Sequence, residues 1–126
     1  ANIITTDIML RRQGKDFKKQ VYNSRIEAIP TFKNNTKKTL VAVELTLSIT
    51  DAFGEKIVDG KDKLDIKIAP GKSQKSKIFF YWEDNPFIPN EPYDKLSGPV
   101  DTGVAKAEMK VIKAVFSDGT VEEYEK

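Results

Sequence analysis

The sequence predicts an all-β fold, a sandwich of about seven or eight antiparallel strands, and three observations carry this prediction. Apolar and polar residues alternate along several segments, as in strands with one buried face. Turn residues separate these segments at short intervals, which is typical of sandwiches and barrels. No segment of useful length shows a helical period with caps. The 126 residues have the size of one domain, which we expect to span 1–126.

The clearest strand lies at 41–50, where every second side chain is apolar: Val41, Val43, Leu45, Leu47 and Ile49. The segment 26–32 alternates as well, and its Pro30 lacks an N–H, which predicts an edge strand or a bulge there. Residues 1–24 read as an N-terminal extension, with strand candidates at 3–10 and 17–22 around a polar loop.

In the second half of the chain, alternation predicts strands at 64–68, 78–82 and 105–116. Pro70-Gly71 predicts a turn after the first of them, and Asp118-Gly119 predicts a hairpin after the last. The phase of the alternation changes near Val111, which indicates either a β-bulge there or burial of both faces.

One long segment, 83–103, has no strand pattern and is rich in proline: Pro86, Pro89, Pro92 and Pro99. Loops of this length are uncommon in compact domains and are often functional. Because proline limits the entropy that is lost on ordering, we expect a stiff and defined loop.

Composition excludes several functions. The chain has no Cys and no His, which excludes disulfides, zinc sites of the Cys/His type, cysteine nucleophiles and histidine-based triads. No apolar run approaches the ~20 residues that span a bilayer, so no transmembrane segment is expected. The 21 basic residues are mostly lysines interleaved with 19 acids, which argues against nucleic-acid binding. Because the sequence opens at Ala1 rather than Met, we expect that a signal peptide or a trimmed segment preceded it.

The turn motifs suggest a family. Lys33-Asn34-Asn35-Thr36, Asp51-Ala52-Phe53-Gly54, Pro70-Gly71 and Asp118-Gly119-Thr120 follow one another between strands over 25–123. This order resembles the small immunoglobulin-like domains of bacterial envelope proteins and lipoproteins, including the FxLYD type, although Ser48–Asp51 replaces the LYD of that type. The resemblance implies an immunoglobulin-like β-sandwich, a mostly non-catalytic role and an extracytoplasmic location, whether periplasmic, cell-surface or secreted.

The long loop is the first candidate site, and its residues of interest are aromatic or acidic: Trp82, Asp84, Phe87, Tyr93 and Asp94. Loops at the end of a sandwich are common binding elements, and aromatic side chains near prolines stack on sugars or dock extended peptides. This interpretation predicts a protein or carbohydrate partner. In the alternative interpretation, Trp82 belongs to the core while Phe87 and Tyr93 hold the loop against the sandwich.

Two further clusters are charged. Asp59, Asp62 and Asp65 surround Gly60, but their spacing is not that of a calcium loop and lysines interleave with them, which favours a solvated turn over a metal site. We therefore expect no metal and no cofactor. Lys72, Lys75 and Lys77 could meet anionic sugars or lipid headgroups, or could guard an edge strand against aggregation.

These observations predict a non-enzymatic binding or structural module of the bacterial cell envelope or extracellular space. One alternative is a small hydrolase that uses carboxylates only, with Glu83 and Asp94 flanking the long loop. Another is a module that assembles with copies of itself through exposed edge strands. The sequence leaves the ligand and the oligomeric state open.

Overall fold

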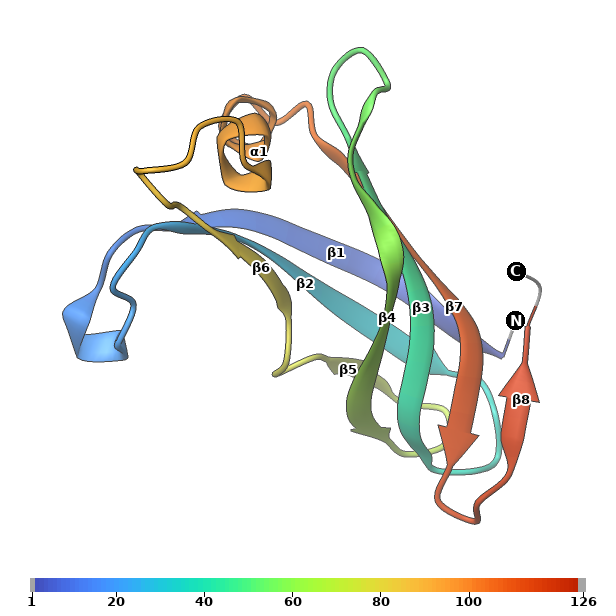
Figure 1. Ribbon diagram of the computed structural model, residues 1–126. Helices are drawn as coiled ribbons and strands as arrows, with labels where there is room; N and C mark the ends of the chain where they lie inside the picture. Colours follow the sequence, from blue (N-terminus) through green and yellow to red (C-terminus); the bar gives the residue numbers. More distant parts are fainter. Residues whose placement is uncertain (1, 125–126) are drawn as a thin grey trace.

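The predicted all-β sandwich is confirmed by the computed structural model, which describes residues 2–124 (Figure 1). Ala1, Glu125 and Lys126, which the predicted domain includes, lie outside the described residues. The described part contains eight strands, one α-helix and one short 3-10 helix. In chain order these are β1 Ile3–Gln13, η1 Phe17–Lys19, β2 Arg25–Asn34, β3 Leu40–Thr50, β4 Lys56–Ile68, β5 Ser73–Lys75, β6 Phe80–Glu83, α1 Pro92–Asp101, β7 Lys106–Phe116 and β8 Val121–Glu123.

The strands form two antiparallel sheets of four strands each. The first sheet has the order β1-β2-β5, and β6 also pairs with β2. The second sheet has the order β4-β3-β7-β8. Figure 1 shows the two sheets facing each other and diverging at the end where α1 lies.

The core lies between the sheets. The alternation of apolar and polar residues in β3 explains which of its side chains enter this core. Val43, Leu45 and Leu47 are all buried, as the sequence predicts. Burial of such a side chain contributes roughly 1.5–3 kcal/mol relative to exposure. Val41, expected on the same face, is only partly buried, because the pairing register of β3 is irregular between Leu40 and Ala42.

The predicted bulge near Val111 is confirmed. The pairing of β3 with β7 passes from Glu44–Lys113 to Leu45–Val111, so Ile112 has no partner in β3. The extra residue changes the phase of the alternation, and both Val111 and Ile112 are buried.

Pro30 lies in a central strand, so the prediction of an edge strand is wrong. It pairs with Ile8 of β1, while its carbonyl accepts from the N–H of Ser76 on the opposite side, at 2.9 Å. In an antiparallel strand the N and C=O of one residue point the same way. The Pro30 nitrogen therefore faces the interruption between β5 and β6, where neither strand pairs with it.

Four other local predictions are wrong. The strand expected at 78–82 begins only at Phe80, and Ile78, expected on its buried face, is 56% exposed. The residues 17–22 contain η1 rather than a strand, because the Asp16 carboxylate accepts from the N–H groups of Lys18 and Lys19 and so caps a helical turn. Gly60 lies inside β4 and not in a turn. The supposed extension is part of the sandwich, since β1 pairs with β2 along its length.

The expected loop at 83–103 contains α1, so the prediction of a loop without helical structure is wrong for 92–101. Pro92 occupies the first helical turn and the Asp94 carboxylate accepts from the N–H of Glu91, both of which are helix-start signals. Two features hide this helix in the sequence. Gly98 and Pro99 disfavour a helix. The buried face consists only of Tyr93 and Leu96, which is too few residues to show a helical period. Among the described residues, no helix has the length and apolar character needed to cross a bilayer.

Candidate functional site

The loop between β6 and α1, residues 84–91, is held by hydrogen bonds at its start. The N–H of Asp84 donates to the carbonyl of Ser24 at 2.8 Å, which ties the loop to the segment before β2. The Asn85 carboxamide oxygen accepts from the N–H of Phe87 at 3.1 Å, and the Asn85 carbonyl accepts from the N–H of Ile88 at 3.1 Å. These bonds form a turn that gives the tip of the loop a defined shape.

Helix α1 holds the other end of the loop. Tyr93 is only 7% exposed, and its hydroxyl accepts from Nη1 of Arg12 at 3.0 Å. The same guanidinium donates to both carboxylate oxygens of Asp101, at 3.1 and 2.5 Å. The hydrogen bond to Asp101 raises the pKa of Arg12 above its ordinary value. Arg12 therefore fastens both ends of α1 to β1.

The tip of the loop carries two uncovered apolar side chains. Phe87 is 92% exposed and Ile88 is about half exposed, at 51%. A second exposed aromatic, Phe53, lies in the turn between β3 and β4 and is 90% exposed. Figure 1 shows this turn and the loop on either side of α1, at the same end of the molecule.

The binding interpretation and the structural interpretation of the loop each fit some of its residues. Tyr93 holds the loop against the sandwich, as the structural interpretation predicts. Trp82 is partly buried on β6 and packs against the core. Phe87 is not held and faces solvent.

The carboxylates named for the candidate site do not all lie in one place. Asp84 and Asp94 line one hollow of about 380 Å³, together with Asn85 and Asn90. Asp94 also accepts from the N–H of Glu91 at 3.2 Å, so it serves the start of α1. Glu83 is not among the residues that line this hollow, and its carboxylate accepts from the Asn23 carboxamide at 3.3 Å.

A buried acid on the outer face of the first sheet was missed by the sequence analysis. Glu27 is fully buried and accepts from Nε of Arg11 at 2.6 Å and from Nε of Arg25 at 2.7 Å. Arg25 lies over the rings of Phe79 and Tyr81, 5.3 and 4.9 Å from their centroids. Glu27 stands at a solvent-facing position of the alternation, on the same strand face as Arg25 two residues before it. The sequence does not show that Arg11 of β1 lies opposite Glu27, so its burial was not predicted.

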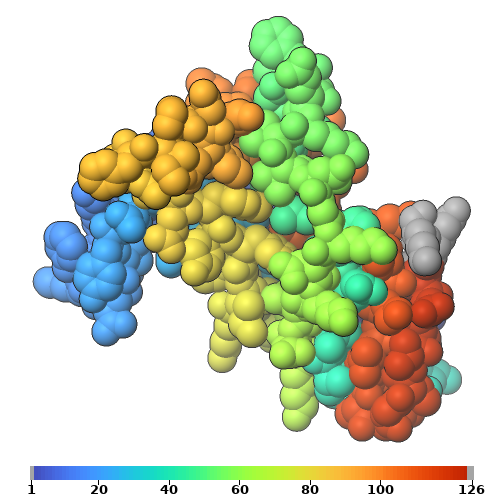
Figure 2. All heavy atoms as spheres, in the orientation of Figure 1, coloured from blue at the N-terminus to red at the C-terminus, as the bar shows by residue number. Residues whose placement is uncertain are grey.

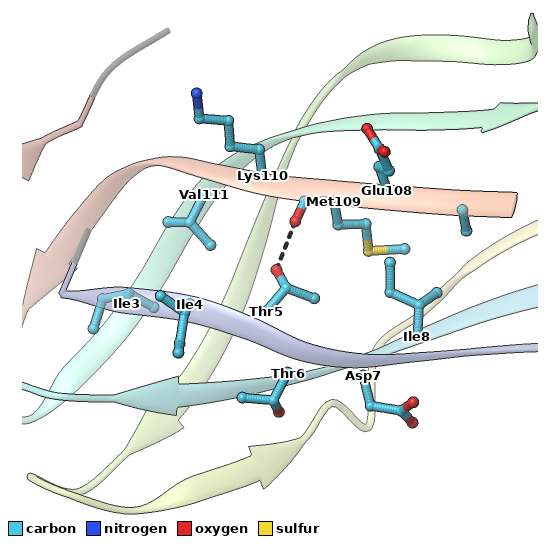
Figure 3. Close-up of a pocket in the computed structure, with 11 residues that line it drawn as sticks. Ile3, Ile4, Thr5, Thr6, Asp7, Ile8, Glu108, Met109, Lys110 and Val111 are labelled. Carbon is cyan, nitrogen blue, oxygen red and sulfur yellow. Dashed lines mark hydrogen bonds between the residues drawn. The ribbon is translucent and has the colours of Figure 1, made fainter.

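A further hollow, of about 580 Å³, lies between β1 and β7. Figure 3 shows Ile8 and Met109 directed between the two strands, whereas Lys110 and Glu108 point away. The Thr5 hydroxyl donates to the Met109 carbonyl at 2.7 Å and so bridges the two strands across the middle of this hollow.

A smaller hollow, of about 430 Å³, lies between β4 and the segment from β5 to Ile78. We call it the lysine groove; it is lined by Asp65, Ile66, Lys67, Gln74, Lys75, Lys77 and Ile78. The lysine-rich stretch of the sequence includes Lys75 and Lys77 but not Lys67, because β4 meets β5 only in the folded sandwich.

The acidic cluster of β4 does not converge. Because successive side chains of a strand point to opposite faces, Asp62 lies on the other face from Asp59 and Asp65. Asp59 is instead paired with Lys56 at 3.4 Å. In residues 2–124, no group of three or more acids, histidines or cysteines is arranged to hold a metal ion.

Comparisons with known proteins found no match: no protein-family model, no curated protein and no solved structure matches this chain.

Proposed function

We propose that this chain is a non-catalytic binding module that contacts a protein or carbohydrate partner through the tip of the loop 84–91. The observation that carries the proposal is Phe87, a large aromatic side chain that is 92% exposed on a loop fixed at both ends. Full burial of such a side chain against a partner is worth roughly 1.5–3 kcal/mol. Because the loop is already ordered, little of this is lost to ordering on binding.

The setting that we propose is the bacterial cell envelope or the extracellular space, with an immunoglobulin-like sandwich as the scaffold. The strand order supports the scaffold assignment. With β1, β2, β3 and β7 taken as strands A, B, C and F, the second sheet corresponds to the C′-C-F-G sheet of variable-type immunoglobulin domains. The extracytoplasmic location follows from the resemblance of the turn motifs and is tested by fractionation of the cells that make the protein.

Exchange of Phe87 for alanine tests the site, with Phe53→Ala as the matched control, since both side chains are about nine-tenths exposed. The probe for carbohydrate is purified peptidoglycan in a sedimentation assay. The probe for protein is a photoreactive phenylalanine analogue at position 87 or 53, with adducts from intact cells identified by mass spectrometry. In the sedimentation assay, we expect Phe87→Ala to lose about tenfold or more in affinity and Phe53→Ala to lose none. In the crosslinking assay, we expect an adduct from position 87 and not from position 53. Equal behaviour of the two positions contradicts the proposal.

The hydrolase alternative retains one specific observation in its favour, the hollow that Asp84 and Asp94 share. Paired carboxylates of this kind cleave glycosides when one is the acid and the other the base or nucleophile. The role of Asp94 at the start of α1 favours the binding proposal instead. The test is turnover of nitrophenyl glycosides by the parent protein and by Asp84→Asn. Activity that this exchange abolishes would establish the hydrolase. Activity that survives it would not come from Asp84 and Asp94.

A further inference from the structure

We infer that the lysine groove is a second interaction surface, which takes an extended, acidic polypeptide segment as an added strand. It lies apart from the loop 84–91 in both residues and elements, so it does not depend on the function proposed for that loop. The inference stands on the free edges of two strands, on an apolar floor and on unbalanced charge.

The strands that border the groove both have an unpaired edge. Among the described residues, β4 pairs only with β3, and β5 pairs only with β2. Figure 2 shows residues 56–68 in green and 73–83 in yellow side by side on the face toward the viewer. An extended peptide that lies along either edge gains main-chain hydrogen bonds.

The floor of the groove fits an apolar side chain. Ile66 lies at its base with 8% exposure, and Ile78 is 56% exposed at its side. The Ser76 hydroxyl donates to the Ile78 carbonyl, which holds the backbone of this segment. Because side chains alternate along a strand, every second residue of a bound peptide can face this floor.

Charge selects the partner. Lys67, Lys75 and Lys77 line the groove against one acid, Asp65, which leaves a formal charge of +2. Within residues 2–124, none of these three lysines is in an ion pair. The Lys75 amine is directed across β2 toward β1, where it lies 3.8 Å from the sulfur of Met9, so it must turn back toward β4 to meet a bound acid. Acidic side chains on the peptide would supply the missing partners and accelerate association.

The hollow between β1 and β7 is a weaker candidate for the same role. The hydrogen bond between Thr5 and Met109 crosses it, and its lining carries charges of both signs, Asp7 and Glu108 with Lys110. Neither feature favours one class of partner.

The experiment uses the whole chain and a synthetic peptide in which glutamate and valine alternate over about six residues, the usual length of a strand. The control peptide has glutamine in place of glutamate. We expect the glutamate peptide to bind in fluorescence anisotropy, and to shift the amide resonances of 64–67 and 73–78 in NMR spectra of the labelled protein. Absence of binding, or equal binding of the glutamine peptide, overturns the inference.

Variants locate the site. Reversal of charge at Lys67, Lys75 and Lys77 to glutamate is expected to weaken binding by about tenfold or more. The matched control reverses Lys15, Lys18 and Lys19 in the exposed β1–β2 connection, which gives the same change of net charge away from the groove. Ile78→Ser is expected to weaken binding by about threefold or more, with the similarly exposed Val104→Ser as its control. Equal losses in a variant and its control contradict the inference.

Two other occupants are outcomes of the same test. Vesicles of phosphatidylglycerol that bind the chain through the three lysines, while the peptide does not, would show a lipid surface instead. Light scattering over a concentration series tests for a second copy of the chain. Assembly of the parent protein that the lysine variant loses would show that a second copy is the occupant. Either result overturns the acidic peptide as the occupant.

Discussion

At the residue scale, side chains of the turns replace backbone partners where strands end. The Asp51 carboxylate accepts from the N–H groups of Phe53 and Glu55, at 2.9 and 3.0 Å, and so closes the β3–β4 turn. Asp118 closes the β7–β8 turn in the same way, with bonds from the N–H and the hydroxyl of Thr120, at 2.9 and 2.6 Å. Short polar side chains suit such positions because they reach the backbone of the turn.

The hairpin acid makes stability depend on pH. The hydrogen bonds from Thr120, and then the nearby Lys38, hold the pKa of Asp118 below its ordinary value of 3.8. A carboxyl group with a lowered folded pKa contributes stability above its unfolded pKa, and this contribution is lost as pH falls through the folded pKa. Glu122 acts in the same direction, because bonds from Asn2 and Tyr124 lower its pKa.

We therefore expect Asp118→Asn, which keeps the oxygen that accepts from Thr120, to lower the free energy of unfolding near neutral pH. The difference from the parent protein should shrink toward zero as the solution becomes more acidic than the folded pKa of Asp118. Urea unfolding near pH 6 and near pH 2 measures this difference in the free energy of unfolding. Asp65→Asn is the control, with the same change of net charge. A difference that is constant over this range would contradict the assignment.

At the element scale, α1 fills the end of the sandwich where the sheets diverge (Figure 1). Leu96 is fully buried and Tyr93 nearly so, and both belong to the core cluster. The helix is short and contains Gly98 and Pro99, so packing rather than intrinsic propensity keeps it folded. The presentation of Phe87 depends on this packing, because the loop 84–91 runs directly into α1.

Leu96→Ala should lower the free energy of unfolding by about 2–5 kcal/mol, since it leaves a cavity under the helix. Lys95→Ala, at the neighbouring exposed position, should change it by less than about 0.5 kcal/mol. Urea denaturation gives both values, and hydrogen exchange shows whether the amides of α1 lose protection first. A loss below about 1 kcal/mol for Leu96→Ala would mean that α1 is not packed as described.

At the scale of the whole molecule, a buried amide side chain joins the two sheets. Asn34, at the end of β2, is fully buried, and its carboxamide donates to the carbonyls of Lys38 and Ile68, at 2.8 and 3.0 Å. Its oxygen accepts from the N–H of Thr36 at 2.9 Å. Because Ile68 ends β4, Asn34 connects the first sheet to the second at the end opposite α1.

We expect Asn34→Ala to cost about 3 kcal/mol of unfolding free energy, because it leaves a buried carbonyl and an N–H without partners. The exposed neighbour Asn35→Ala is the control and should be nearly neutral. Thermal unfolding followed by circular dichroism compares the two. Similar melting temperatures would show that this network does not connect the sheets.

The sequence alone determined the features that depend on neighbours along the chain. Alternation identified β3, β7 and the inward face of Val43, Leu45 and Leu47, and the change of phase identified the bulge at Ile112. Turn residues placed the ends of β2, β3, β4 and β7. Phe87 was identified as a residue of interest for a similar local reason, because it is an aromatic among prolines.

Only the tertiary structure decided features whose partners come from far along the chain. Pro30 tolerates a central strand because β5 and β6 leave a break beside it, and the short α1 persists because the diverging sheets bury Leu96. The pairing of β1 with β2 brings Arg11 to Glu27, and the lysine groove forms where β4 meets β5. Burial and charge at such sites depend on which strands lie side by side, and no local pattern encodes that.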